Sequence, residues 1–284
     1  MATAEGWIVN TPYCNALGID DVAFADGRCQ LRLPFREANA NPTGILHGGV
    51  AASLSVMAGQ AVAYTTLGVD SGPWYTADIQ INYLAAATGE TLSADATLAQ
   101  KGRDLCFSAV EIRNGDGRKI AQSLLLVRAR HGDNQVVSRP HGSLTLARHG
   151  EAPMAERIRK NPFIASRGME MALQEGGNCL ITMPSAEGNK SAEGAIHEGA
   201  ILALLDTAGA MACFPLVGRP AKRAVTPSIQ AQFLGLPPAE DLEARAKVIH
   251  REGELFWTDV EVGALDKSDV VARGTVVYRI VPEN

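Results

Sequence analysis

The sequence predicts an α+β protein made of two similar domains in tandem, each a long central helix wrapped by an antiparallel sheet of about five to six strands. Three observations predict this fold: a repeat at a fixed spacing, one long apolar stretch in each half, and alternating apolar and polar residues after each stretch. The repeat is clearest where HGGVAASLSVMAG (47–59) returns as HEGAILALLDTAG (197–209), 150 positions later. The same offset aligns Cys29 with Cys179 and Tyr83 with Phe233.

The first half shows the order of elements most clearly. Cys29, Leu31 and Leu33 alternate with polar residues, which predicts a half-buried strand. A loop is expected next, and then a helix over about 47–67, rich in small residues that allow close packing. Four alternating strand patterns with short turns follow, as is typical of an antiparallel meander: 75–84, 91–102, 104–114 and 119–130.

The second half repeats this order. A strand is expected within 178–185 and a helix over about 197–215. Four strands are expected after the helix: 224–234, 242–251, 254–263 and 269–280. Residues 131–160 have no match in the repeat, and we expect a connector that ends in a short helix. The predicted boundaries are a first domain over 1–130, a linker over 131–160 and a second domain over 161–284.

Composition narrows the class of function. The net charge of −5 argues against nucleic acid as the main partner, because no surplus of basic residues neutralises phosphates. Five scattered cysteines predict reduced thiols in a cytoplasmic protein, and the N-terminus shows no secretory signal. His131, His141 and His149 have no metal-ligand spacing, so no metal is expected. The apolar stretch 199–218 carries Asp206 at its centre, which favours a helix enclosed by protein over a membrane span.

One motif suggests a family. A histidine and two glycines are followed, after six residues, by a position for an acid, and an asparagine stands six residues before the histidine. This pattern resembles the hotdog-fold acyl-CoA thioesterases of the phenylacetate-operon type, and the resemblance covers both halves. It implies two fused hotdog units that pair within one chain as an intramolecular pseudo-dimer with antiparallel helices. It also implies no cofactor, since CoA is part of the substrate, and a homodimer of such fused chains.

The resemblance also implies a division of labour between the two units. One unit supplies an oxyanion site from the backbone N–H after the motif histidine and from the asparagine, and its partner supplies the acid and a hydroxyl group. Helix geometry supports this division. Gly48 and the acid position at 56 are eight residues apart, about 12 Å along one helix, so both cannot touch one carbonyl carbon.

The two halves have lost complementary parts of this set. The first half keeps Asn41, His47 and Gly48, and the second has Asp206 at the acid position and Thr226 at the hydroxyl position. The opposite pairing lacks a base, because its members are Ser191, His197, Glu198, Val56 and Thr76. We therefore expect one active site per chain. Whether Glu198 pairs with a basic residue or fills the incomplete site stays open.

The resemblance gives each candidate residue a role in hydrolysis. The Gly48 N–H and the Asn41 amide would bind the thioester oxygen, and Asp206 would act as general base or nucleophile. Thr226 would orient the water or the carboxylate, and His47 would hold the loop and the thioester end. Structural roles remain open: a helix start for His47, a turn for Asn41 and an ordinary strand position for Thr226.

Basic residues at strand ends are candidates for binding the CoA phosphates: Lys101, Arg103, Lys222 and Arg223. Two other functions compete with thioester hydrolysis. One is an enoyl-thioester hydratase or dehydratase, and the other is a non-enzymatic acyl-CoA-binding module.

Overall fold

The computed structural model describes residues 4–68, 72–129, 139–218 and 220–283. The first set of elements comprises α1 (Ala4–Val9), α2 (Pro12–Leu17), β1 (Asp21–Ala25), β2 (Arg28–Leu33), η1 (Glu37–Asn39), α3 (Gly48–Leu67), β3 (Trp74–Tyr83), β4 (Leu92–Lys101), β5 (Leu105–Asn114) and β6 (Lys119–Ala129). The second set comprises α4 (Ala155–Arg159), α5 (Pro162–Ser166), β7 (Glu170–Glu175), β8 (Asn178–Met183), η3 (Glu187–Asn189), α6 (Glu198–Cys213), η4 (Phe214–Leu216), β9 (Ala221–Phe233), β10 (Leu242–Glu252), β11 (Leu255–Ala264) and β12 (Val270–Pro282). The predicted α+β class and the repeated order are confirmed.

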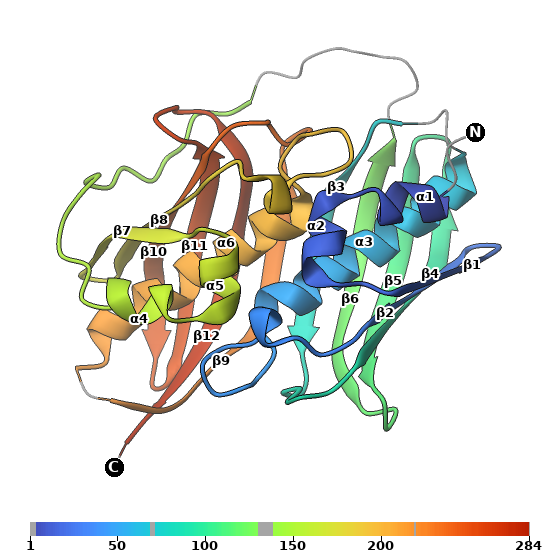
Figure 1. The fold of residues 1–284 in the computed structure, drawn as a ribbon. Coiled ribbons are helices and arrows are strands. Elements are labelled where there is room, and N and C mark those ends of the chain that lie inside the picture. Colours follow the sequence, from blue (N-terminus) through green and yellow to red (C-terminus); the bar gives the residue numbers. More distant parts are fainter. Residues whose placement is uncertain (1–3, 69–71, 130–138, 219, 284) are drawn as a thin grey trace.

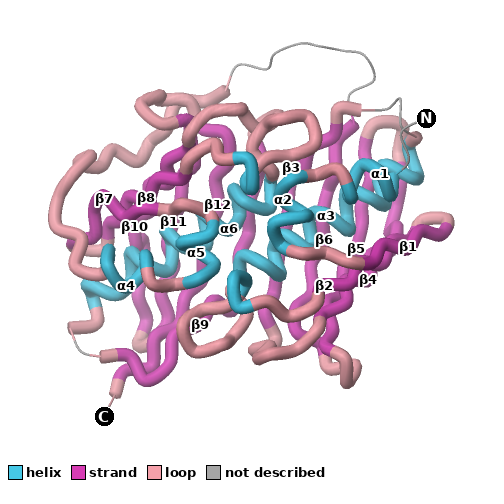
Figure 2. The backbone as a smooth tube through the Cα atoms, viewed as in Figure 1, coloured by secondary structure: helices cyan, strands magenta, loops and turns pink. Residues whose placement is uncertain are grey.

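The strands form one antiparallel sheet that runs through both units. Its order is β1-β2-β4-β5-β6-β3-β9-β12-β11-β10-β8-β7, so each unit contributes six strands. The units join where β3 pairs with β9, with Ile79 opposite Ala231 and Asn82 opposite Ser228. The sheet curves around the two long helices, and α6 and α3 lie next to each other across its concave face (Figures 1 and 2). The pairing of two hotdog units within one chain follows from this arrangement.

The long helices α3 and α6 meet at glycine positions in an antiparallel arrangement. A Cβ atom added at Gly49 would lie 2.6 Å from the Cβ of Ala203, and one added at Gly199 would lie 2.9 Å from the Cβ of Ser53. The start of each helix therefore touches the middle of the other. Only glycine allows this approach, and it brings the N-terminus of α3 to the acid position of α6.

The end of α6 differs slightly from the prediction of a helix to about 215, because the last turn is a 3₁₀ helix. Pro215 has no N–H, so it cannot donate to the carbonyl of Met211, four residues earlier. The side chain of Gln174 donates to that carbonyl instead, at 2.7 Å.

The short lead-in helices cross between the units, which the sequence did not predict. Tyr13 on α2 stacks on His197, with ring centroids 4.9 Å apart, and its N–H donates to Lys190. Phe163 on α5 stacks on His47 at 4.6 Å, and its N–H donates to Ala40. Each lead-in therefore covers the helix start of the other unit.

The predicted linker contains one repeated element. Helix α4 precedes α5 as α1 precedes α2, and the 150-residue offset carries Trp7 of α1 onto Arg157 of α4. The part of the connector before α4 runs along the second unit, where the Ser143 N–H donates to Glu261. Residues 131–138 lie outside the described residues, so the domain boundaries stay a prediction.

Both long helices are long and apolar enough to cross a membrane, yet 83% of the most apolar segment of α3 and 78% of that of Glu198–Leu216 are buried inside the fold. All five cysteines are free and buried.

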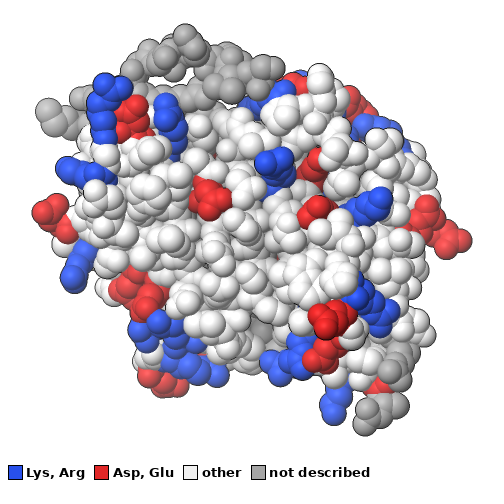
Figure 3. Space-filling model, turned by 180° about the vertical axis from the view of Figure 1, so that it is seen from behind, with Lys and Arg blue, Asp and Glu red and all other residues white. Residues whose placement is uncertain are grey.

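The side of the molecule that faces away from the viewer in Figure 1 shows a broad uncharged area between scattered charged side chains (Figure 3). Association of two chains stays a prediction.

Candidate active site

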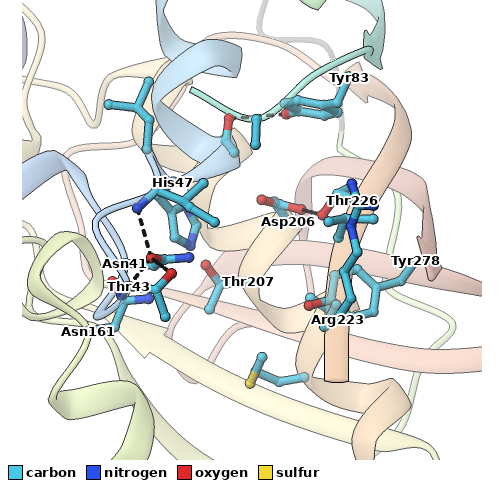
Figure 4. Close-up of a pocket in the computed structure, with 18 of the residues that line it drawn as sticks. Asn41, Thr43, His47, Tyr83, Asn161, Asp206, Thr207, Arg223, Thr226 and Tyr278 are labelled. Atoms are coloured by element: carbon cyan, nitrogen blue, oxygen red, sulfur yellow. Dashed lines mark hydrogen bonds between the residues drawn. The ribbon is translucent and has the colours of Figure 1, made fainter. Parts of the chain in front are cut away.

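A pocket of about 530 Å³ lies where the two units meet. Asn41, His47 and Gly48 line it from the first unit, and Asp206 and Thr226 line it from the second. Figure 4 shows Asn41 and His47 on one side of the pocket and the Asp206–Thr226 pair on the other. The structure thus brings together all five residues expected to carry the chemistry.

His47 caps the N-terminus of α3. Its Nδ1 accepts a hydrogen bond from the Gly49 N–H at 3.0 Å, which satisfies one of the first donors of the helix. Burial lowers the pKa of His47 to about 4, so its imidazole is neutral near pH 7. Because Nδ1 accepts, Nε2 carries the proton. The helix-start role left open for His47 is therefore present in the structure.

The N–H of Gly48, the first residue of α3, donates to no group in the described part of the chain. A Cβ atom at Gly48 would lie only 2.9 Å from Oδ2 of Asp206. The carboxylate therefore lies next to the start of α3, where Gly48 lines the pocket. Helix N-termini favour negative charge, so this N–H is suited to stabilise a developing oxyanion.

Asn41 forms the turn that the sequence left as its alternative role. Its Oδ1 accepts from the Thr43 N–H at 2.9 Å, from the Thr43 hydroxyl at 2.8 Å and from the Ile45 N–H at 3.1 Å. These bonds fix the orientation of the side-chain amide. Its Nδ2 donates to none of the described residues, so it remains available as a donor at the pocket.

Asp206 lies in the middle of α6 with 3% of its surface exposed. Burial raises the pKa of its carboxyl group from 3.8 to about 6, and a hydrogen bond of 2.8 Å from the Thr226 hydroxyl partly offsets this rise. Asp206 is therefore mostly ionised at neutral pH, yet basic enough to accept a proton.

Two tyrosines that the motif did not suggest also line the pocket. Tyr83 donates from its hydroxyl to the carbonyl of Gly48 at 3.2 Å. The equivalent position in the second unit is Phe233, which has no hydroxyl group. This difference between the two copies of the repeat could have marked Tyr83 as a residue of the complete site. Tyr278 comes from β12, and burial, followed by the charge of Asp206, raises its pKa.

The incomplete set is filled by Glu198, which answers the open question about this residue. Its carboxylate accepts from the Thr76 N–H at 3.0 and 3.1 Å and from the Gln60 side chain at 2.6 Å. Burial raises the pKa of Glu198 to about 7, and the hydrogen bonds from Thr76 partly offset the rise. Val56 stands at the acid position, and His197 caps α6 as His47 caps α3.

Three aromatic rings pack together in the first unit, at the positions equivalent to one part of the pocket. Trp7 stacks on Tyr64 with centroids 5.7 Å apart and meets Trp74 edge-on at 6.4 Å. The 150-residue offset carries these three residues onto Arg157, Phe214 and Ala224, all of which line the open pocket. The second unit therefore has an arginine and an alanine at the pocket where the first unit has two tryptophan rings.

The basic candidates lie in two places, two at the start of β9 in the second unit and two at the β4–β5 turn of the first unit. Arg223 lines the pocket, whereas Lys222, its neighbour on β9, does not. Lys101 and Arg103 lie at the β4–β5 turn. That turn joins the start of β3 through the Asp104–Ala129 hydrogen bond and the pairing of Ala129 with Trp74, whereas the pocket lies at the other end of β3. The structure does not bring Lys101 and Arg103 to the pocket.

Sequence comparison agrees with the repeat. Residues 43–121 and 193–271 each match the family model described as the thioesterase superfamily, and the two matches begin 150 residues apart. The chain is similar to acyl-coenzyme A thioesterase 13 of Homo sapiens and of Pongo abelii. It is 31% identical to each over 104 residues, which cover 36% of this chain and 72% of the relative.

Structure comparison extends the likeness to the whole chain. A proposed thioesterase II from Thermobifida fusca aligns with a TM-score of 0.66 at 14% identity, covering 95% of this chain and 98% of that chain. A protein with a hot dog fold from Alicyclobacillus acidocaldarius aligns with a TM-score of 0.63 at 15% identity, covering 93% and 97%. At these identities the likeness shows the fold alone, and it confirms the predicted tandem hotdog architecture.

Proposed function

Because the chain belongs to the thioesterase superfamily, we propose that it hydrolyses an acyl-CoA or aroyl-CoA thioester at one composite site between its two units. The observation that carries the proposal is the position of the Asp206 carboxylate beside the unpaired N–H of Gly48. A base and an oxyanion donor from different units then face one carbonyl group, and neither unit supplies both.

The residues of the pocket account for each proton and electron pair of hydrolysis. The thioester oxygen accepts hydrogen bonds from Gly48 N–H and Asn41 Nδ2, which draws electrons from the carbonyl carbon. Asp206 takes a proton from water as the water oxygen bonds to that carbon, and the electron pair of the C=O bond moves onto oxygen. The tetrahedral intermediate then collapses, the C–S bond breaks, and the leaving thiolate takes the proton from Asp206. Direct attack by Asp206, followed by hydrolysis of the resulting anhydride, uses the same arrangement.

The remaining pocket residues have supporting roles in this proposal. Thr226 fixes the carboxylate of Asp206 by its hydrogen bond, and neutral His47 fixes the start of α3. The resemblance to relatives named acyl-coenzyme A thioesterase supports CoA as the thiol portion. Arg223 at the pocket wall is suited to its phosphate groups.

The test is thiol release from a panel of CoA thioesters, followed with a thiol reagent. Wild type should release thiol, and Asp206→Asn should lower kcat by about 10²–10⁴-fold, the usual contribution of a general base. Asp259→Asn, a matched change on the outer face of the same unit's sheet, should leave kcat unchanged. No thiol release from any thioester, or hydration of an enoyl thioester without thiol release, would overturn the proposal.

A further inference from the structure

The arginines of the pocket all lie on the second unit and its lead-in: Arg157 on α4, Arg223 on β9 and Arg279 on β12. Among the described residues that line the pocket, Asp206 is the one acid, so their net charge is positive. Arg279 is paired with Glu254 at 2.5 Å. Arg157 and Arg223 form no ion pair within the described part of the chain, and both side chains are exposed. These two guanidinium groups can bind an external anion.

The pseudo-symmetry of the fold shows where a side chain at position 157 reaches. Its counterpart Trp7 contacts Tyr64 and Trp74, and its indole N–H donates to Glu193 at 3.2 Å. The equivalents of these three partners are Phe214, Ala224 and Thr43, and each lines the pocket together with Arg157. An aromatic ring at this position closes one site, whereas an arginine borders the other.

The pKa of Tyr278, on the pocket wall formed by β9 and β12, agrees with this position of Arg157. The positive charge of Arg157 acts on Tyr278, where it lowers the pKa of the phenol against the stronger effect of burial. Figure 4 shows Tyr278 and Arg223 on the wall of the pocket that also carries Thr226. Arg157 therefore adds its charge to the wall that already holds Arg223.

We propose that Arg157 is a substrate-binding residue that, together with Arg223, holds a phosphate group of the CoA portion of the thioester. The inference rests on the proposed function, and it adds a residue from α4, outside both matched segments, to the site. A guanidinium group can donate two parallel hydrogen bonds to a phosphate, which suits a charge held at an open pocket wall. The described residues that line the pocket from the first unit include no arginine or lysine.

The test compares two thioesters of the same acid, one of CoA and one of N-acetylcysteamine, which has no phosphate. Arg157→Ala should raise KM for the CoA thioester by about tenfold, the usual worth of one charged hydrogen bond, and should leave kcat nearly unchanged. It should leave kcat/KM for the N-acetylcysteamine thioester unchanged. Arg159→Ala, on the same helix but away from the pocket, is the matched control and should change neither value.

Several outcomes would overturn the inference. An equal loss with both thioesters would show that Arg157 supports the fold or the thioester itself. A loss confined to thioesters of acids with a second carboxylate would assign Arg157 to the acyl group. If wild type hydrolyses no thioester, the proposed function fails, and calorimetric titration with CoA and pantetheine decides the inference alone. In that case Arg157→Ala must weaken binding of CoA and leave binding of pantetheine unchanged.

Discussion

A methyl group added at Gly48 would lie 2.9 Å from Oδ2 of Asp206, closer than real Cβ atoms approach other groups. Gly48→Ala should therefore displace either the carboxylate or the start of α3 and lower kcat by about 10²–10³-fold, as does the loss of one oxyanion donor. Gly115→Ala is the control, because Gly115 lies in a turn with nothing within 4 Å of an added Cβ. Steady-state kinetics on both variants measure the effect, and equal rates would contradict the composite site.

Thr226 controls the charge of Asp206 and therefore the pH dependence of the reaction. Burial raises the pKa of Asp206 to about 6, and activity needs its ionised form, so kcat/KM should fall about tenfold per unit below that pH. The Thr226 hydroxyl stabilises the ionised form. Thr226→Val removes that hydrogen bond, so the acid limb of the profile should move to higher pH.

The pH profile of kcat/KM has a control within the same pocket. The hydroxyl of Thr207 donates to the carbonyl of Ala203 and not to Asp206, so Thr207→Val should leave the acid limb in place. An acid limb that stays unmoved in Thr226→Val, or that moves equally in both variants, would refute the assignment of the limb to Asp206.

The sequence was sufficient to predict the two units and the residues that meet at the pocket. The 150-residue offset shows that Asp206 and Gly48 belong to complementary copies, and helix geometry shows that one copy cannot hold both. Local alternation predicted the strands because each strand has one buried face, as in the pattern of β5. These features depend on residues near one another in the chain or on the repeat itself.

Contacts between the units could not be predicted in this way. The stacking of Phe163 on His47 joins segments more than a hundred residues apart, and no local pattern encodes it. The place of Arg157 depends on the same crossing of the lead-in helices. A basic charge at a strand end predicts Lys101 and Arg103 as candidates for the CoA phosphates, but strand pairing places their turn at the end of β3 away from the pocket.

Glu198 should make the stability of the fold fall as pH rises. The pKa of its carboxyl group is raised from 4.5 to about 7 in the folded state. The contribution of this group to the free energy of unfolding is therefore fully present below pH 4.5 and is lost as pH rises through 7. The shift corresponds to about 3 kcal/mol. Glu198→Gln keeps an acceptor for the Thr76 N–H and does not ionise. Between pH 5 and 8, the free energy of unfolding should therefore fall by about 2.5 kcal/mol less in Glu198→Gln than in wild type.

Urea unfolding at pH 5 and pH 8 measures this difference. Asp206 also has a raised pKa, but it contributes equally to wild type and Glu198→Gln, and so it cancels in the comparison. Glu175→Gln, a change at an exposed glutamate, is the control and should behave like wild type. If wild type and Glu198→Gln lose the same stability over this range, the buried carboxylate is not the group responsible.

Ala224 keeps open the space that Trp74 fills in the other unit. Trp74 packs against Tyr64 with ring centroids 4.8 Å apart, and the equivalent Ala224 and Phe214 both line the pocket. Ala224→Trp should recreate this contact and lower kcat/KM for a CoA thioester by at least about tenfold, which is about 1.4 kcal/mol of lost transition-state binding. Ala224→Val should have an intermediate effect, because its side chain fills less of the space.

The matched control for this closure is Gln230→Trp, which adds the same ring on the outer face of β9, away from the pocket. It should keep wild-type kinetics, and thermal unfolding of both tryptophan variants should show that the fold survives. A graded loss from alanine through valine to tryptophan, with Gln230→Trp unaffected, would show that open space at position 224 admits the substrate. Full activity in Ala224→Trp would mean that the substrate does not use the space beside position 224.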